Sequence, residues 1–307
     1  MTPPNIPNHP PAASDHPASL AESYLEIACD NLPVVNQALR DYGTTSLSAY
    51  LPTLLSDAYP SYQPRDDLLT VVYQYAASLL GSPIASRAVE DLARHPVVLT
   101  NHHGVDYFSQ SVQGSLLFAL PRLCGSLRAT TVPVFSCGIV PLRSLTYPRG
   151  LLIYQGNDHT IERLPRRLPL FSKQFRTKMV SAVPAFDTRM VNKAEKRSHR
   201  MMKTGQIASR LAPTFQTIFQ EDYRAEPVTT LPSYSDQSVV VNARMWRRLF
   251  AELSNVPELV YLEQENIVAA LLEADVANPR SLAWGVLFDP KLRESILEAL
   301  DGLPGCW

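Results

Sequence analysis

One segment near residue 100 constrains the fold of this chain more than any other. The apolar, β-branched run 96–100 leads into a polar turn that contains Gly104. Apolar residues then recur at helical spacing from Val105 to Ala119, and Pro121 is expected to stop that helix. A strand, a tight turn and a helix N-terminus in this order form the unit from which parallel α/β sheets are built. Ligands bind at such turns because free backbone N–H groups and the helix dipole point at them.

The downstream sequence predicts further strands and helices. Residues 131–137 predict a second strand, 140–154 a β-hairpin that turns around Pro148 and Gly150, and 193–211 a helix. In the C-terminal third we expect strands at 238–241, 259–262 and 282–288, and helices at 244–253, 265–274 and from Asp289 as N-cap to Gly302. Alternation of strand and helix favours a sheet with parallel strands.

We therefore expect an α/β fold with a Rossmann-like, mostly parallel sheet. Residues 1–17 contain six prolines and no apolar periodicity, which predicts a disordered leader. A single α/β domain is expected over residues 18–307. It divides into a helical N-terminal portion at 18–94 and a Rossmann-like core at 95–307.

The composition argues against several classes of protein. Apolar residues make up 45% of the chain and charged residues 19%, as in globular proteins that bury a core. No apolar run reaches about 18 residues, so no membrane span is expected. The first basic residue is Arg40, which leaves no basic region for a secretory signal. The four cysteines form no Cys-x-x-Cys pair, which argues against a zinc ribbon or a disulfide framework and favours a cytoplasmic protein.

The charges are unevenly distributed along the chain. Residues 163–210 contain 13 Lys or Arg residues against two acidic residues, although the net charge of the whole chain is −1. Such a basic segment is either a solvated face or a site for a phosphate-bearing ligand such as a nucleotide, coenzyme A or a tRNA. The isoelectric point near 6.7 argues against a dedicated binder of duplex DNA.

The turn after residue 100 carries the densest group of chemically versatile side chains. His102 and Asp106 are four residues apart and could share a helix face as ligands of one metal ion. The neighbouring His103 would point in another direction, so a third ligand would come from Asp158 or His159. One interpretation of the turn is therefore a metal site.

A second interpretation is acyl transfer. His102 and Asp106 have the His-x-x-x-Asp spacing of coenzyme A-dependent acyltransferases, in which the histidine is the general base. Asn101 and His102 also match the start of the Asn-His-x-Ser-x-x-Asp motif of glycerolipid acyltransferases, although Asp106 stands one residue early. A purely structural interpretation remains open as well, in which Asn101 caps the helix and His102 binds a loop carbonyl.

A third interpretation is nucleotide transfer. The run from His102 to Val105 resembles the His-x-Gly-His signature of class I nucleotidyl transferases, with Val105 in place of the last histidine. In that superfamily the imidazoles stabilise charge on the phosphates of ATP, and the glycine lets the nucleotide approach the backbone. Lys178 and Met179 match the first two positions of the superfamily's mobile Lys-Met-Ser-Lys-Ser loop.

The order of elements adds a second resemblance. Residues 95–160 resemble the nucleotide-binding core of the bacillithiol-synthesis cysteine ligase family. In that family a Val-Pro-Val-Phe strand, here 132–135, leads to a segment that contains Asp and His, here Asp158 and His159. The resemblance implies that the turn binds phosphate and that the Asp-His segment faces the second substrate.

We therefore expect a biosynthetic ligase or transferase that acts on a small molecule and uses a nucleotide or another phosphate-bearing substrate. ATP and Mg²⁺ are the expected cofactors, and a phosphate-bearing carrier or a tRNA is a further expected partner. The alternatives are a coenzyme A-dependent acyltransferase with His102 as general base and a non-enzymatic protein whose basic segment binds an acidic partner. The candidate catalytic residues are His102, His103, Asp106, Asp158 and His159, and the candidate phosphate-binding residues are Asn101, Gly104, Arg176 and Lys178.

Overall fold

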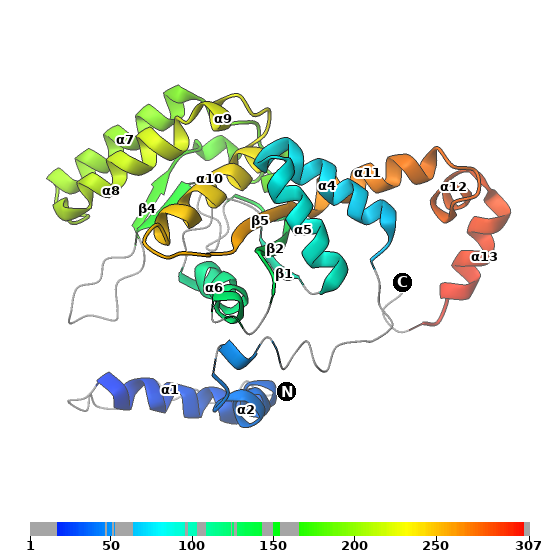
Figure 1. Cartoon of the computed structure of the whole chain (residues 1–307), viewed down its shortest axis with the longest axis horizontal. Coiled ribbons are helices and arrows are strands. Elements are labelled where there is room, and N and C mark those ends of the chain that lie inside the picture. The colour runs from blue at the N-terminus through cyan, green and yellow to red at the C-terminus, as the bar shows by residue number, and fades with distance from the viewer. Residues whose placement is uncertain are drawn as a thin grey trace.

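A three-stranded parallel sheet lies at the centre of the computed structural model (Figure 1). Its strands are β1 (Leu99–His102), β2 (Thr131–Cys137) and β5 (Glu258–Glu263), in the order β1-β2-β5. Both pairings are parallel, so the carboxyl ends of all three strands meet at one edge. The structure describes residues 17–46, 48–50, 52, 64–95, 98–102, 109–123, 125, 128–142, 150–153 and 166–303.

Helices cover both faces of this sheet. The face that carries Val132 and Val134 packs against α6 (Ser109–Leu123) and α10 (Tyr234–Leu249). The opposite face, which carries Val260 and Leu262, packs against α4 (Asp66–Leu80), α5 (Ser82–Arg94) and α11 (Gln264–Val276). Alternate residues of one strand therefore belong to two separate apolar cores, because successive side chains of a strand point to opposite faces of the sheet. The result is a three-layer arrangement of helix, sheet and helix.

A second lobe is inserted between β2 and β5, and we call residues 138–233 the insert lobe. It contains the antiparallel pair β3 (Gly150–Ile153) and β4 (Arg166–Pro169) and a separate apolar core around Phe171, Phe186 and Tyr223. Its described helical elements are η1 (Lys173–Phe175), η2 (Val180–Ala182), α7 (Thr188–Lys203), η3 (Ser209–Leu211), α8 (Ala212–Thr217), the π-helical turn η4 (Ile218–Tyr223) and α9 (Glu226–Thr229). The predicted basic segment falls within this lobe.

The remaining helices lie outside the three layers. Near the N-terminus, α1 (Pro17–Asn31) and α2 (Pro33–Tyr42) contact each other and lie below the sheet in Figure 1. After α11 the chain continues through α12 (Leu282–Phe288) and α13 (Pro290–Leu300). Most described residues of the portion 18–94 are helical, and Pro17, predicted to belong to the leader, already lies in α1.

Two predicted strands are wrong because they are helical. Residues 238–241 lie inside α10, where Val239 packs on the sheet and Val241 packs on the core of the insert lobe. A helix buried on two sides has a continuous apolar run and loses the amphipathic period that would distinguish it from a strand. Residues 282–288 form α12, which begins where the Ser281 hydroxyl accepts the Trp284 N–H. The N-cap of α13 was predicted correctly, because the Asp289 side chain accepts two backbone N–H groups there, and the helix ends at Leu300, two residues before the predicted Gly302.

Most of the predicted hairpin over residues 140–154 lies outside the described residues, and its described ends pair with other segments. Strand β3 pairs with β4, and Pro141 pairs instead with Met179. Gly150 begins β3, where a Cβ atom would lie only 2.1 Å from the Leu168 carbonyl oxygen. The glycine therefore permits close approach of two strands.

Two predicted helix ends differ from the structure. Pro121 lies in the last turn of α6 and does not stop it, since the helix continues to Leu123. The helix predicted over 193–211 is α7, which starts at Thr188 and ends at Lys203. It ends there because Gly205 takes a left-handed φ of 68°.

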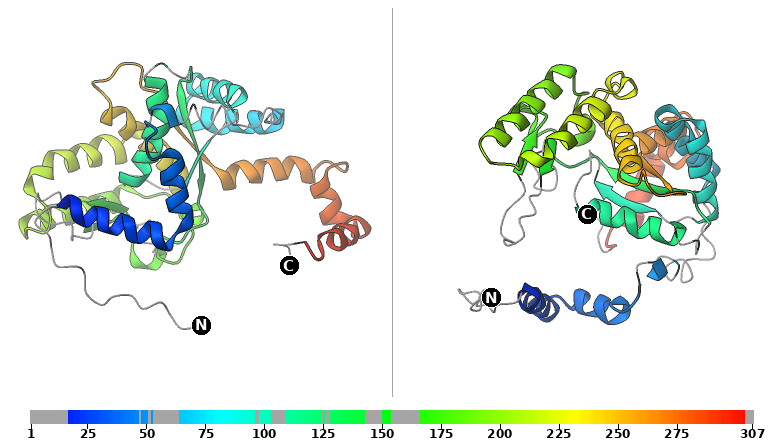
Figure 2. Two further views of the ribbon diagram at one scale, coloured as in Figure 1. Left: turned by 90° about the horizontal axis from the view of Figure 1, so that it is seen from below. Right: turned by 60° about the vertical axis from the view of Figure 1, so that its left-hand side comes forward.

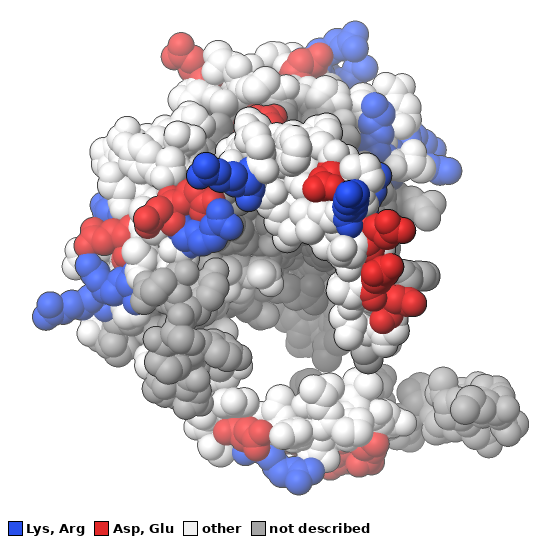
Figure 3. Space-filling model, turned by 90° about the vertical axis from the view of Figure 1, so that its right-hand side faces the viewer, with Lys and Arg blue, Asp and Glu red and all other residues white. Residues whose placement is uncertain are grey.

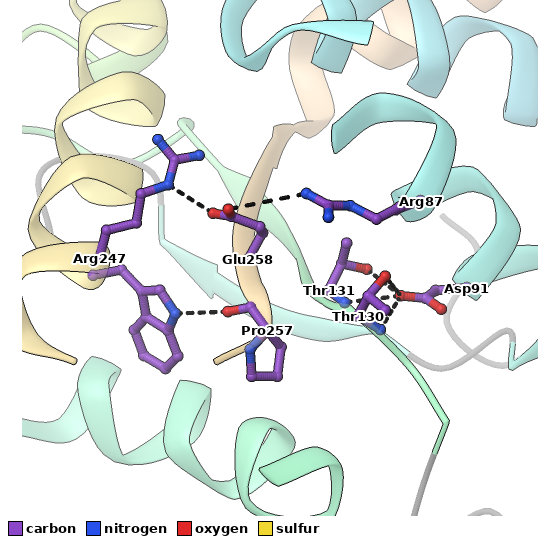
Figure 4. Close-up of polar contacts among 8 residues, drawn as sticks. Arg87, Asp91, Thr130, Thr131, Arg247, Pro257 and Glu258 are labelled. Carbon is purple, nitrogen blue, oxygen red and sulfur yellow. Dashed lines mark hydrogen bonds and ion pairs between the residues drawn. The ribbon is translucent and has the colours of Figure 1, made fainter. Parts of the chain in front are cut away.

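Polar contacts hold the amino ends of the strands (Figure 4). One carboxylate oxygen of Asp91, on α5, accepts the backbone N–H groups of Thr130 at 2.9 Å and Thr131 at 2.8 Å, and the Thr131 hydroxyl at 2.7 Å. Nearby, Glu258 forms ion pairs with Arg247 at 2.8 Å and Arg87 at 3.9 Å. These contacts fix α5 and α10 to the end of the sheet opposite the carboxyl edge.

Candidate active site

A row of polar residues closes one face of the sheet at its carboxyl edge. Asn101, Ser136 and Glu263 are register partners on the three strands, so they lie abreast on one face. The row before them is apolar or aromatic and ends in Tyr261, whose hydroxyl accepts the Asn101 amide at 3.3 Å. The apolar core on this face of the sheet therefore ends between these two rows. In open parallel sheets this is the edge where ligands bind.

Glu263 is the central residue of this row. It is 2% exposed, although it is the last residue of β5. The Ser235 hydroxyl of α10 donates to Oε1 at 2.6 Å, and the Asn266 amide of α11 donates to Oε2. Both carboxylate oxygens therefore have fixed positions. The chain passes from β5 into α11 without a loop, which places Asn266 in reach of the strand end.

Burial is the main reason that the pKa of Glu263 is raised to about 7. The hydrogen bond from Ser235 opposes this rise, and the carboxylates of Glu265 and Asp236 contribute to it. Tyr75 of α4 lies beside this group, where burial first and then the carboxylates of Glu263 and Asp236 raise its pKa well above the ordinary value for a phenol. A carboxyl group with a pKa near 7 can give or take a proton at neutral pH, which an ordinary glutamate does poorly.

The chain directly after β2 contacts both α11 and the segment 178–182 of the insert lobe. The Gly138 N–H donates to Glu265 Oε1 at 2.7 Å, and its carbonyl accepts the Ser181 N–H at 3.1 Å. A Cβ atom on Gly138 would lie 2.8 Å from the Ser181 Cβ and 3.0 Å from the Ser181 nitrogen. Only glycine allows the segment 178–182 to approach the strand end this closely.

Substitution of Gly138 by alanine is therefore expected to destabilise the protein by about 1–3 kcal/mol, because backbone atoms must move to accept the methyl group. Gly114→Ala in α6 is the matched control, since among the described residues its Cβ would meet only Leu99 side-chain atoms, at 3.5 Å. That change is expected to be neutral or stabilising, because alanine favours a helix over glycine. Urea unfolding of both variants is the measurement, and equal stability of the two would contradict the close approach.

The sequence-predicted site residues are only partly described. Asn101 lies at the carboxyl edge as expected, and His102 ends β1 in register with Cys137. The side chain of His102 lies outside the described part of the structure. The predicted residues His103, Gly104, Asp106, Asp158 and His159 lie wholly outside the described residues.

The two predicted phosphate-binding cations lie in the insert lobe. Arg176 follows η1, and Lys178 lies over the Phe175 ring at 6.0 Å; both are exposed. The Lys178 carbonyl accepts the Leu142 N–H, four residues beyond Gly138. Among the described residues, Ser181 and not Lys178 is the lobe residue that meets the end of β2.

Glu263, Ser235 and Asn266 were missed by the sequence analysis. Each comes from a different element, and Ser235 was placed before a predicted strand. The available signal was the sequence Glu263-Gln264-Glu265 directly after an apolar strand, which marks a polar strand end. Within the described residues no group of three or more His, Cys, Asp or Glu side chains could bind a metal ion, and no described helix is long and apolar enough to cross a membrane.

Comparisons with family models, with curated protein sequences and with solved structures returned no match to this chain.

Proposed function

We propose that this protein is an enzyme that binds a small molecule at the carboxyl edge of the parallel sheet and uses Glu263 as a general acid–base group. The observation that supports the proposal most directly is a buried carboxyl group with a pKa of about 7 at that edge. Proton transfer is most efficient when the pKa of the group lies near the working pH, and it contributes about 10²–10⁴-fold to a rate. Ser235 and Asn266 would orient the two carboxylate oxygens.

A nucleotide-dependent ligase or transferase is the second candidate. The observation in its favour is that β1, α6 and β2 form a parallel strand–helix–strand crossover, the unit from which nucleotide-binding sheets are built. Strand β5 extends this sheet. In this proposal the three strands are a small Rossmann-like sheet whose turn after β1 binds phosphate. Because Glu263 and Glu265 are acidic, a nucleotide near them would require a divalent cation such as Mg²⁺ between the phosphates and the carboxylates.

The test is metabolite depletion. The purified protein is incubated with a small-molecule extract, and compounds that disappear or form are followed by mass spectrometry, with and without added ATP and Mg²⁺ or coenzyme A. We expect the protein to convert at least one compound, and Glu263→Gln to slow that conversion about 10²–10⁴-fold. The rate should change with pH around 7, rising with pH if Glu263 acts as a base and falling if it acts as an acid.

Glu258→Gln is the matched control. Glu258 begins the same strand whose last residue is Glu263, so the two substitutions make the same chemical change at opposite ends of β5. We expect this variant to keep full turnover. Equal turnover by Glu263→Gln would exclude the acid–base role, and the failure of the wild-type protein to convert any compound would favour a non-enzymatic function. Dependence of the conversion on ATP and Mg²⁺ would favour the second candidate, and dependence on coenzyme A would favour acyl transfer.

A further inference from the structure

The outer side of α7 is a continuous row of cations. The helix buries Val191, Ala194, Ser198 and Met201, and its basic side chains fall on the opposite side. All of them are exposed, and we call this set the α7 ridge: Arg189, Lys193, Lys196, Arg197, Arg200 and Lys203. From the first to the last of these residues the helix rises about 21 Å.

No acidic side chain interrupts this ridge. The one acidic residue within α7, Glu195, is turned towards Arg224 and binds its guanidinium at 2.5 Å. Among the described residues, none of the six ridge cations takes part in an ion pair. The side of the molecule that carries α12 and α13 differs, because Lys and Arg side chains alternate there with Asp and Glu (Figure 3).

The ridge weakens the helix that carries it. Like charges repel at the i,i+4 pairs Arg189–Lys193, Lys193–Arg197 and Lys196–Arg200, each by a few tenths of a kcal/mol. Arg189 also lies in the first turn, where the helix dipole disfavours a positive charge. An anionic partner lying along the ridge would remove both penalties.

The surroundings of the ridge favour one class of partner over the others. The flanks of α7 are occupied, because α8 packs beside it and Arg197 donates to the Pro169 carbonyl of β4 (Figures 1 and 2). Sequence-specific DNA-binding proteins of the helical classes insert a helix into the major groove of duplex DNA. A helix covered on its flanks, like α7, cannot enter the groove in this way. None of the exposed large apolar side chains of the described chain lies on α7, which disfavours insertion into a membrane surface.

We propose that the α7 ridge binds the phosphate backbone of double-helical RNA. RNA helices are recognised through their shape and their phosphates rather than through a deep groove, so a flat cationic row is sufficient. Arg166 and Arg167 of β4, both exposed, extend the basic surface beside the ridge. This proposal is independent of the acid–base role of Glu263, which lies on the sheet and not in the lobe.

The test is fluorescence anisotropy with a labelled 20-base-pair RNA hairpin. We expect binding that weakens steeply with salt, with a slope of log K against log[salt] of about −3 or steeper. The charge-reversed variant K193E/K196E/R200E should bind at least about tenfold more weakly at low salt. Circular dichroism of the same preparation checks that α7 has folded.

The matched control is R280E/K291E/R293E, which changes the net charge by the same amount on exposed residues outside the insert lobe. We expect it to bind RNA like the wild type. Equal losses in the two variants would mean that only net charge matters and would overturn the proposal. Absence of RNA binding by the wild type would overturn it, as would equal or tighter binding of the same hairpin made of DNA. Binding to vesicles of phosphatidylserine in place of RNA would also overturn it.

Discussion

Replacement of Glu263 by glutamine is expected to stabilise the protein at alkaline pH and to have little effect at acid pH. In the folded protein burial raises the pKa of this carboxyl to about 7, whereas in the unfolded chain it stays near 4.5. Below pH 4.5 the group is protonated in both states and contributes nothing. Between pH 4.5 and 7 it is ionised only in the unfolded chain, so wild-type stability falls as the pH rises.

Above pH 7 the folded protein must hold a buried negative charge. A difference of this size between the two pKa values corresponds to about 3 kcal/mol. Glutamine has the same shape and cannot ionise, so its free energy of unfolding should exceed that of the wild type by a margin that grows by about 3 kcal/mol between pH 4.5 and pH 8. Urea unfolding of both proteins across this range is the measurement. A margin that stays constant with pH would show that Glu263 has an ordinary pKa.

This expectation links stability to function. A buried carboxyl kept ionisable near pH 7 weakens the fold, and a residue of this kind is retained where activity depends on it. Gain of stability together with loss of turnover in Glu263→Gln is therefore the pattern expected of an acid–base group. A residue that only supports the fold would instead lose stability when substituted.

Replacement of Asp91 by alanine is expected to destabilise the protein by about 3–5 kcal/mol. Its carboxylate accepts two backbone N–H groups and the hydroxyl of Thr131, a residue that is fully buried. Alanine would leave the N–H and the hydroxyl of Thr131 buried without an acceptor, and each unsatisfied buried donor costs about 1–3 kcal/mol. In a chain of this length we expect the melting temperature to fall by roughly 10 °C.

Glu258→Ala is the matched control for Asp91→Ala, because Glu258 is an acidic residue at the same end of the sheet (Figure 4). Its ion pairs join it to arginines that are 44–47% exposed, and exposed ion pairs contribute about 0–1 kcal/mol. We expect this variant to lose less than about 1 kcal/mol. Similar losses for the two variants would mean that charge, and not the buried hydrogen bonds, fixes this end of the sheet.

The parallel sheet could be predicted from local sequence, and the insert lobe could not. Strands β2 and β5 are short apolar runs bounded by polar residues, and a run of this length is strand-like wherever it lies. The valines of α10 form a similar run, but the sheet covers one side of that helix and the insert lobe covers the other. Their helical state depends on the Ser233 cap and on tertiary packing, which local periodicity does not contain.

The candidate site was predictable only in its location. Asn101 stands at the end of a predicted strand, and the rule that ligands bind at the carboxyl ends of parallel strands directs attention to that edge. The acid–base character of Glu263 depends on burial by α10 and α4 and on the nearby carboxylates of Glu265 and Asp236. Those contacts join residues far apart in the chain, so no local sequence motif predicts them.

The central claim is that Glu263 titrates near neutral pH, and the most direct measurement is its titration by NMR. Glutamate side-chain carboxyl carbons are labelled with ¹³C, and the signal of Glu263 is identified by its absence from Glu263→Gln. We predict a midpoint at about pH 7, well above the midpoints of exposed glutamates. A midpoint near 4.5 would contradict the account, because Glu263 would then be a permanently ionised residue at the end of β5.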